Sequence, residues 1–138
     1  MRPIGIYIHV PFCLRKCNYC DFASYVCPES QREGYVAQVC QEIETGPGQG
    51  SQVGSVFVGG GTPTLLTADQ LLCLLEAVRR RYTLLPEAEI SLEGNPGTVT
   101  AEQLSALRQG GYNRLSLGVQ AVQGRLLQAL GRIHNLDQ

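Results

Sequence analysis

Three cysteines lie close together near the N-terminus of this 138-residue chain. Cys13, Cys17 and Cys20 follow an apolar segment that is typical of a β-strand. Three thiolates in one short loop can bind a single iron–sulfur cluster, because cysteine is the usual ligand of such centres. When only three ligands hold four irons, one iron keeps a free coordination position, as a catalytic metal does. The spacing therefore favours an iron–sulfur cluster, which in the four-iron case would leave one iron open to a small molecule.

Two other interpretations of these cysteines remain open from the residues alone. A structural zinc site could take His9 or Cys27 as its fourth ligand, although zinc ligands generally come as two separated pairs. Three free thiols are the other possibility, which fits scattered cysteines better than so tight a group. Outside the group, Cys40 falls on the apolar side of a predicted helix and is expected in the core. Cys73 falls on the polar side of another helix, and the sequence assigns it no role.

A run of three glycines, in residues 59–64, ends the second predicted strand. Glycines let a ligand approach the main chain closely, because no Cβ stands in the way. The run lacks both the Gly-Lys-Ser/Thr of a phosphate-binding loop and the spaced glycines of a dinucleotide site. It lies at the carboxyl end of a strand, where parallel α/β proteins bind their ligands.

Three polar residues fall at or just beyond comparable positions. Glu93 is predicted to close the third strand, Gln120 to close the fourth, and Arg132 follows the last predicted helix. If they converge, the carboxylate suits an ammonium group, the amide suits hydroxyls, and the guanidinium suits a carboxylate. That combination fits a zwitterionic ligand that carries hydroxyls.

The elements that position these residues alternate between strand and helix patterns. Strands are expected over residues 4–9, 55–58, 89–92 and 114–119, and helices over residues 35–43, 71–82, 104–107 and 122–130. Thr67 and Thr100 suit helix N-caps, Gly46 and Gly110 suit helix ends, and residues 46–54 suit a flexible surface loop. The βαβαβαβα order favours an α/β fold with a parallel sheet. Four such units do not close a barrel of eight, so we expect the N-terminal part of a larger domain.

Composition narrows the class of protein. Apolar residues make up 43% and charged residues 17%, which is typical of a globular domain. The net charge of −1 argues against a nucleic-acid-binding surface, which carries excess positive charge. Neither a membrane span nor a signal peptide is evident, so a cytoplasmic location is expected.

The motifs together resemble one known family. Those that carry the resemblance are residues 7–13 with Cys17 and Cys20, then residues 59–64, 93–96, 114–120 and 130–132. They resemble the radical S-adenosylmethionine (SAM) proteins, in particular the branch of the oxygen-independent coproporphyrinogen III oxidase and its relative, the heme chaperone. The blocks follow the family's order over almost the whole chain.

This resemblance implies a fold, cofactors and site residues. The fold would be a partial (β/α) barrel of about four units, with residues 1–138 as the N-terminal part of a radical SAM core domain that lacks its remaining units and a C-terminal domain. The three cysteines would hold a [4Fe–4S] cluster whose fourth iron binds SAM, and electron transfer to SAM would give methionine and a 5′-deoxyadenosyl radical. The implied SAM contacts are Tyr7, Tyr19, Gly60, Gly61, Thr62, Glu93, Gln120 and Arg132. His9 would either donate a hydrogen bond near the cluster or be a satisfied strand histidine.

One position separates the two members of the branch. The oxidase carries a further cysteine two residues after the third ligand, whereas this chain has Phe22. The difference favours the chaperone-like member, with the decarboxylating oxidase and a non-catalytic zinc module as alternatives, so enzymatic activity stays undecided. The chaperone's heme motif is absent, because His134 and Asn135 are followed by Gln138 in place of its tyrosine. The implied partners are SAM, heme or a porphyrinogen, a reductant such as flavodoxin or ferredoxin, and an acceptor that could be a peripheral membrane protein.

Overall fold

Four parallel strands form the main sheet. The computed structural model describes residues 2–138. The strands are β1 (Ile4–Val10), β4 (Gln52–Gly60), β5 (Thr83–Gly94) and β6 (Arg114–Leu117), in the order β1-β4-β5-β6. Every neighbouring pair is parallel. The predicted α/β fold with a parallel sheet of about four βα units is therefore confirmed.

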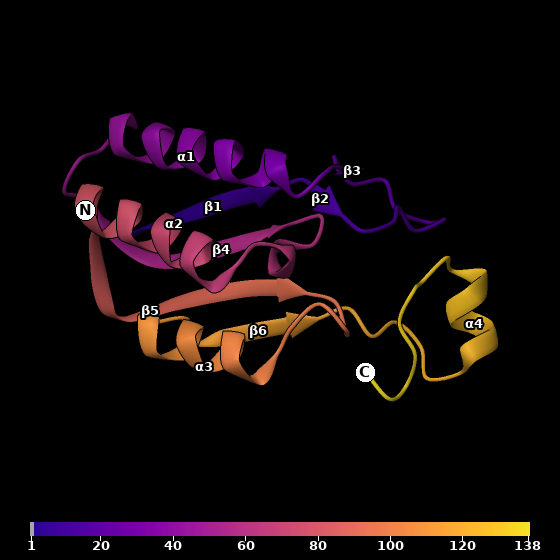
Figure 1. Cartoon of the computed structure of the whole chain (residues 1–138). Coiled ribbons are helices and arrows are strands. Elements are labelled where there is room, and N and C mark those ends of the chain that lie inside the picture. Colours follow the sequence, from indigo (N-terminus) through magenta and orange to yellow (C-terminus); the bar gives the residue numbers. More distant parts are fainter. Residues whose placement is uncertain (1) are drawn as a thin grey trace.

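Three helices connect these strands and lie side by side in Figure 1. They are α1 (Ser30–Thr45), α2 (Ala68–Arg81) and α3 (Ala101–Gly110). Each crossover leads to the next strand in the same direction, so right-handed connections place all three helices on one face of the sheet. The short helix α4 (Gly124–Ala129) lies apart from them, beyond the carboxyl ends of the strands (Figure 1). In the described part of the chain, no helix has the length and apolar character that a membrane crossing requires.

The core fills the space between the sheet and these helices. Its most buried side chains include Val10, Val53, Val56, Val58, Leu71, Leu74, Leu75, Val78 and Leu92. Because side chains alternate along a strand, the strand residues next to these buried ones point to the opposite face of the sheet. That second face carries Tyr7, His9 and Glu93, and Tyr7 is 58% exposed there.

The two predicted helix N-caps, Thr67 and Thr100, are confirmed. Thr67 accepts a hydrogen bond from the Gln70 backbone N–H (3.1 Å), and the Gln70 side chain accepts one from the Thr67 N–H (3.0 Å), which makes a capping box. Thr100 caps α3 in the same way through its hydroxyl. Gly46 ends α1 as predicted. At α3 the prediction was one residue short, because Gly110 is still helical and Gly111, at φ 112°, takes the left-handed position.

Several strand boundaries differ from the predictions. β4 starts at Gln52, so the surface loop expected over residues 46–54 is shorter. β5 starts at Thr83, where Thr83 and Leu84 pair with Gln52 and Val53 before the register shifts. β6 ends at Leu117, two residues earlier than predicted. Three short elements were not predicted: β2 (Phe12–Cys13), β3 (Tyr25–Val26) and the 3-10 helix η1 (Pro63–Leu65).

Candidate cofactor site

A cavity of about 340 Å³ opens at the carboxyl ends of β4, β5 and β6. Its size lies within the range of small-molecule pockets, about 300–1,000 Å³. It brings together every predicted site residue except Tyr7, namely Cys13, Cys17, Tyr19, Cys20, Gly60, Gly61, Thr62, Glu93, Gln120 and Arg132. Tyr7 lines an adjoining hollow of about 230 Å³, which shares Gly60 and Glu93 with the main cavity.

The cysteine loop is closed at its base by a small pair of strands. Cys13 belongs to β2, which pairs with β3, and the Tyr25 N–H donates to the Pro11 carbonyl (2.8 Å). The two ends of the cysteine loop, at β2 and β3, therefore lie side by side. Within it, the Cys20 N–H donates to the Cys17 carbonyl (3.1 Å), which forms a tight turn between the second and third cysteines.

The glycine run fixes the first cysteine against the end of β4. The Gly61 N–H donates to the Val10 carbonyl (2.7 Å), and the Thr62 N–H donates to the Phe12 carbonyl (2.6 Å). The Thr62 hydroxyl also donates to the Cys13 sulfur (3.8 Å). A Cβ on Gly61 would lie 2.6 Å from the Phe12 carbonyl oxygen and 3.0 Å from the Cys13 sulfur. Only glycine therefore fits at this position without moving the cysteine.

Arg132 joins the C-terminal part of the chain to the second cysteine. Its Nη1 donates to the Cys17 sulfur (3.4 Å), and its Nη2 donates to the Asn95 Oδ1 (2.7 Å) and to the Gly118 carbonyl. A Cβ on Gly118 would lie 3.2 Å from the Arg132 Nη2 and 2.9 Å from the Asn95 Oδ1. The absence of a side chain at Gly118 therefore lets Arg132 and Asn95 approach its backbone. Among the described residues, the buried Nε of Arg132 finds no partner. A buried donor without a partner suits a site that is completed by an anionic ligand.

Glu93 places a carboxylate on the open face of the sheet. Its Oε2 accepts a hydrogen bond from the Gly60 N–H (3.0 Å), which orients the group toward the cavity that both residues line. A carboxylate has about four acceptor positions, so it can receive further donors from a ligand. A Cβ on Gly59 would lie 2.7 Å from this Oε2, which explains a second glycine in the run.

His9 and Tyr7 form a fixed pair beside Glu93. The His9 Nε2 donates to the Ala23 carbonyl (2.7 Å), so its Nδ1 accepts from the Tyr7 hydroxyl (2.8 Å). Both ring nitrogens are therefore used within the protein, as expected of a satisfied strand histidine. Partial burial, assisted by the negative charge of Glu93, raises the pKa of Tyr7 and keeps its hydroxyl protonated at neutral pH.

The zinc interpretation finds no geometric support. Across residues 2–138, no three His, Cys, Asp or Glu side chains are grouped closely enough to hold one metal ion. His9, which was a candidate fourth ligand, has both nitrogens hydrogen-bonded. Thiolates that bind different irons of a cluster need not converge on one point, so the cysteine arrangement is compatible with the larger group.

Gln120 reaches the cavity through a strained backbone. It lies three residues beyond the end of β6, not at the strand end as predicted. Among the described residues, it is the only non-glycine with a positive φ, at 66°. Such conformations cost free energy and cluster at ligand sites. Two backbone hydrogen bonds hold this turn. The Val119 N–H donates to the Leu117 carbonyl (3.0 Å), and the Ala121 N–H donates to the Val119 carbonyl (2.8 Å).

Tyr19 lies beside the second cysteine and Arg132. Burial raises the pKa of its hydroxyl, and the Arg132 charge partly opposes this effect. The side chain is 49% exposed and lines the cavity. Its ring is therefore available to a ligand between the cysteine loop and Arg132.

Asn95 is a site residue that the sequence interpretation missed. Its Nδ2 donates to the Thr62 hydroxyl (3.0 Å), and its Oδ1 accepts from Arg132 (2.7 Å). It thereby links the group that contacts the Cys13 sulfur to the group that contacts the Cys17 sulfur. A signal existed, because Asn95 directly follows the last residue of β5 at the same sheet edge.

Comparison with known proteins decides the family. The pattern of the Radical SAM superfamily matches residues 7–138. The chain belongs to the radical SAM superfamily. The heme chaperone HemW of Escherichia coli is 42% identical to it over 137 residues, which cover 97% of this chain and 36% of that protein. HemW of Synechocystis is 44% identical over 147 residues, covering 100% of this chain and 36% of that protein.

A solved radical SAM structure shares the fold. The structure described as "Coproporphyrinogen III oxidase (HemN) from Escherichia coli is a Radical SAM enzyme" matches with a TM-score of 0.89 and 33% identity. The match covers 97% of this chain and 32% of the oxidase chain. The present chain thus spans about a third of the length of these radical SAM proteins.

Proposed function

We propose that this chain is the cluster- and SAM-binding N-terminal part of the core domain of a heme chaperone. The observation that carries the proposal is the single cavity in which three cysteines meet the polar residues of three strand ends. The proposal is further supported by the chain's similarity to proteins named heme chaperones over nearly all of its length.

The residues present fit the two cofactors of the superfamily. Cys13, Cys17 and Cys20 would hold a [4Fe–4S] cluster, with Thr62 and Arg132 donating to two of the sulfurs. Donors to cluster sulfurs are one of the means by which a protein adjusts the reduction potential of the cluster. When bound, the cluster would supply the electron that cleaves SAM into methionine and a 5′-deoxyadenosyl radical.

The remaining cavity residues would each bind a different part of the SAM molecule. Glu93 would accept from the SAM ammonium group, and the positive charge of Arg132 would attract the carboxylate. Gly60 and Gly61 would let the ligand approach the main chain, and Gln120 would bind the ribose hydroxyls. These roles require no movement of the sheet, because all of these residues already line the same cavity.

Phe22 supports the chaperone over the oxidase. It lines the cavity and is 61% exposed, at the position where the oxidase branch carries a further cysteine. Heme or a porphyrinogen, a reductant such as flavodoxin or ferredoxin, and a membrane-associated heme acceptor are the partners that we propose for the whole protein. The oxidase remains a second candidate because its structure matches this chain with a TM-score of 0.89.

Anaerobic reconstitution with iron and sulfide tests the cluster. We expect about four irons and four sulfides per chain and a brown chromophore. Cys17→Ala should lose the chromophore, whereas Cys27→Ala, which changes a cysteine outside the cavity, should retain it. Stoichiometric zinc without sulfide, lost on changing Cys27, would instead support the zinc-stabilised module.

The two whole-protein activities need the full-length protein. The chaperone predicts heme binding, followed by transfer of heme to an acceptor, and no decarboxylation of coproporphyrinogen. Decarboxylation that depends on SAM, in the absence of heme transfer, would assign the protein to the oxidase. Both assays share the same cluster preparation, so a negative result is interpretable only with a full complement of iron.

A further inference from the structure

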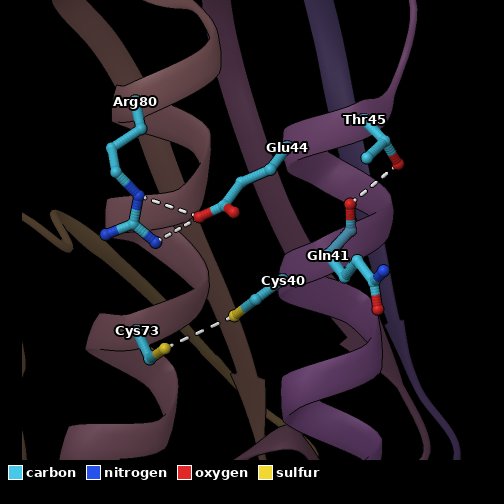
Figure 2. A network of polar contacts seen from close by, with 6 residues as sticks. All are labelled: Cys40, Gln41, Glu44, Thr45, Cys73 and Arg80. Carbon is cyan, nitrogen blue, oxygen red and sulfur yellow. Dashed lines mark hydrogen bonds and ion pairs between the residues drawn. The ribbon is translucent and has the colours of Figure 1, made fainter.

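Two cysteines outside the cavity face each other between the first two helices. The Cys40 sulfur on α1 lies 3.4 Å from the Cys73 sulfur on α2, at thiol hydrogen-bond distance (Figure 2). The two residues are 33 positions apart in the sequence. The helices pack side by side on one face of the sheet, whereas the cavity opens at the carboxyl ends of the strands.

A second contact holds the two helices in this register. Arg80 of α2 donates from its Nε to the Glu44 carboxylate of α1 (2.8 Å), and one of its Nη atoms donates to the same oxygen. Glu44 follows Cys40 by four residues and Arg80 follows Cys73 by seven, so each pair lies on one stripe of its helix. Figure 2 shows the two contacts one above the other between the same two helices.

The two sulfurs differ in access to solvent. Cys40 is 8% exposed and belongs to the core, whereas Cys73 is exposed. Burial, together with the hydrogen bond to Cys73, raises the pKa of the Cys40 thiol to about 12. An oxidant in solution therefore reaches Cys73 first, whereas Cys40 is a buried, protonated thiol at neutral pH.

We propose that Cys40 and Cys73 are a redox-active pair that closes to a disulfide by exchange with a low-molecular-weight disulfide of the glutathione type. The Cys73 thiolate attacks one sulfur of that molecule, forms a mixed disulfide and releases one thiolate. Cys40 then passes its proton to the thiolate released in the first step and attacks the Cys73 sulfur, which releases the second thiolate. The two protein thiols lose two electrons, and the small disulfide gains them as two thiols.

The bond would tie α1 to α2 around the strand that leads to the cofactor site. The closed segment contains β4 and the glycine run with Gly60 and Gly61. Cross-links stabilise mainly by limiting the unfolded chain, and more so for long loops. For a loop of this length we expect the melting temperature to rise by roughly 10 °C on oxidation.

Peptide mapping of the 138-residue chain tests the proposal directly. The chain is treated with glutathione disulfide, its free thiols are blocked, and it is cut with trypsin and with a protease that cleaves before aspartate. Trypsin alone leaves both cysteines in one peptide, Glu33 to Arg79, and cleavage before Asp69 separates them. We expect the two halves to stay joined until a reductant is added. Separate halves with glutathione fixed on Cys73 would overturn the proposal, as would two unmodified thiols.

A matched variant tests the effect on stability. Cys73→Ser changes an exposed side chain and should fold normally, and Cys27→Ser is a control that keeps the pair. The melting temperature of the unchanged chain and of Cys27→Ser should rise on oxidation, whereas that of Cys73→Ser should not move. An equal rise in all three proteins would show that the helix–helix bond is not its source.

Discussion

Gly61→Ala is expected to disturb the cofactor site through a single methyl group. The added Cβ would lie 2.6 Å from the Phe12 carbonyl oxygen, and ordinary contact begins at 3.4 Å, so the backbone of β2 must move by about 0.8 Å. Overpacking of this kind typically costs about 1–3 kcal/mol. The shift also carries Cys13, and ligand constellations tolerate only about 0.5 Å of displacement.

Two measurements on Gly61→Ala test this expectation. Urea unfolding should show a loss of about 1–3 kcal/mol in the free energy of unfolding. After anaerobic reconstitution, the iron content per chain should fall below that of the unchanged protein. The reasoning predicts both losses together, because the same backbone movement causes them.

Gly34→Ala is the matched control. Gly34 lies inside α1, where an added Cβ meets nothing within 4 Å. Replacing a helical glycine by alanine there should stabilise the chain by about 0.5–1 kcal/mol and leave the iron content unchanged. The reasoning is refuted if Gly61→Ala unfolds at the same urea concentration and binds as much iron as the unchanged chain.

Three further substitutions test other parts of the molecule. Arg132→Met removes the donors to Cys17, Asn95 and Gly118 and should raise the Kd for SAM at least about tenfold in equilibrium dialysis, whereas an unchanged Kd would remove Arg132 from the site. Thr67→Ala breaks the capping box of α2 and should cost about 1 kcal/mol in urea unfolding, with no change in iron content. Tyr112→Phe removes a buried hydroxyl that donates to the Leu71 carbonyl (2.8 Å) and should cost about 1 kcal/mol at pH 7. Burial raises the pKa of Tyr112 above its ordinary value of 10.0, so its contribution is complete below pH 10 and is lost as pH rises toward the folded-state pKa. The free energy of unfolding should therefore fall more steeply above pH 10 in the unchanged chain than in Tyr112→Phe, and equal slopes would contradict this role.

The sequence predicted the repeating elements well because their signals are local. Alternation of apolar residues and capping threonines depends on neighbours in the chain, and the four strands, three long helices and both caps were found where expected. Strand ends were less accurate, because pairing partners decide them. The first residues of β5 are strand only because they pair with Gln52 and Val53, and Pro86 in the same strand lacks a backbone donor.

Contacts between distant parts of the chain were the hardest to predict. Cys13, Glu93 and Gln120 could be placed at one sheet edge from topology, although Gln120 reaches it by a strained turn that no local pattern showed. Asn95 was missed because its role depends on meeting Thr62 and Arg132 in space. The approach of Cys73 to Cys40 was missed for a similar reason. Cys73 lies on the polar side of α2, and only the packing of α2 against α1 brings it to Cys40.

Electron paramagnetic resonance of the reduced, anaerobically reconstituted chain tests the central claim most directly. Spectra would be recorded without addition, with SAM, and with adenosine, which lacks the methionine part of SAM and therefore its α-amino and carboxylate groups. The account predicts a cluster signal that changes with SAM and not with adenosine, because only SAM can bind the iron that the three cysteines leave free. A cluster signal that is identical with and without saturating SAM would contradict it.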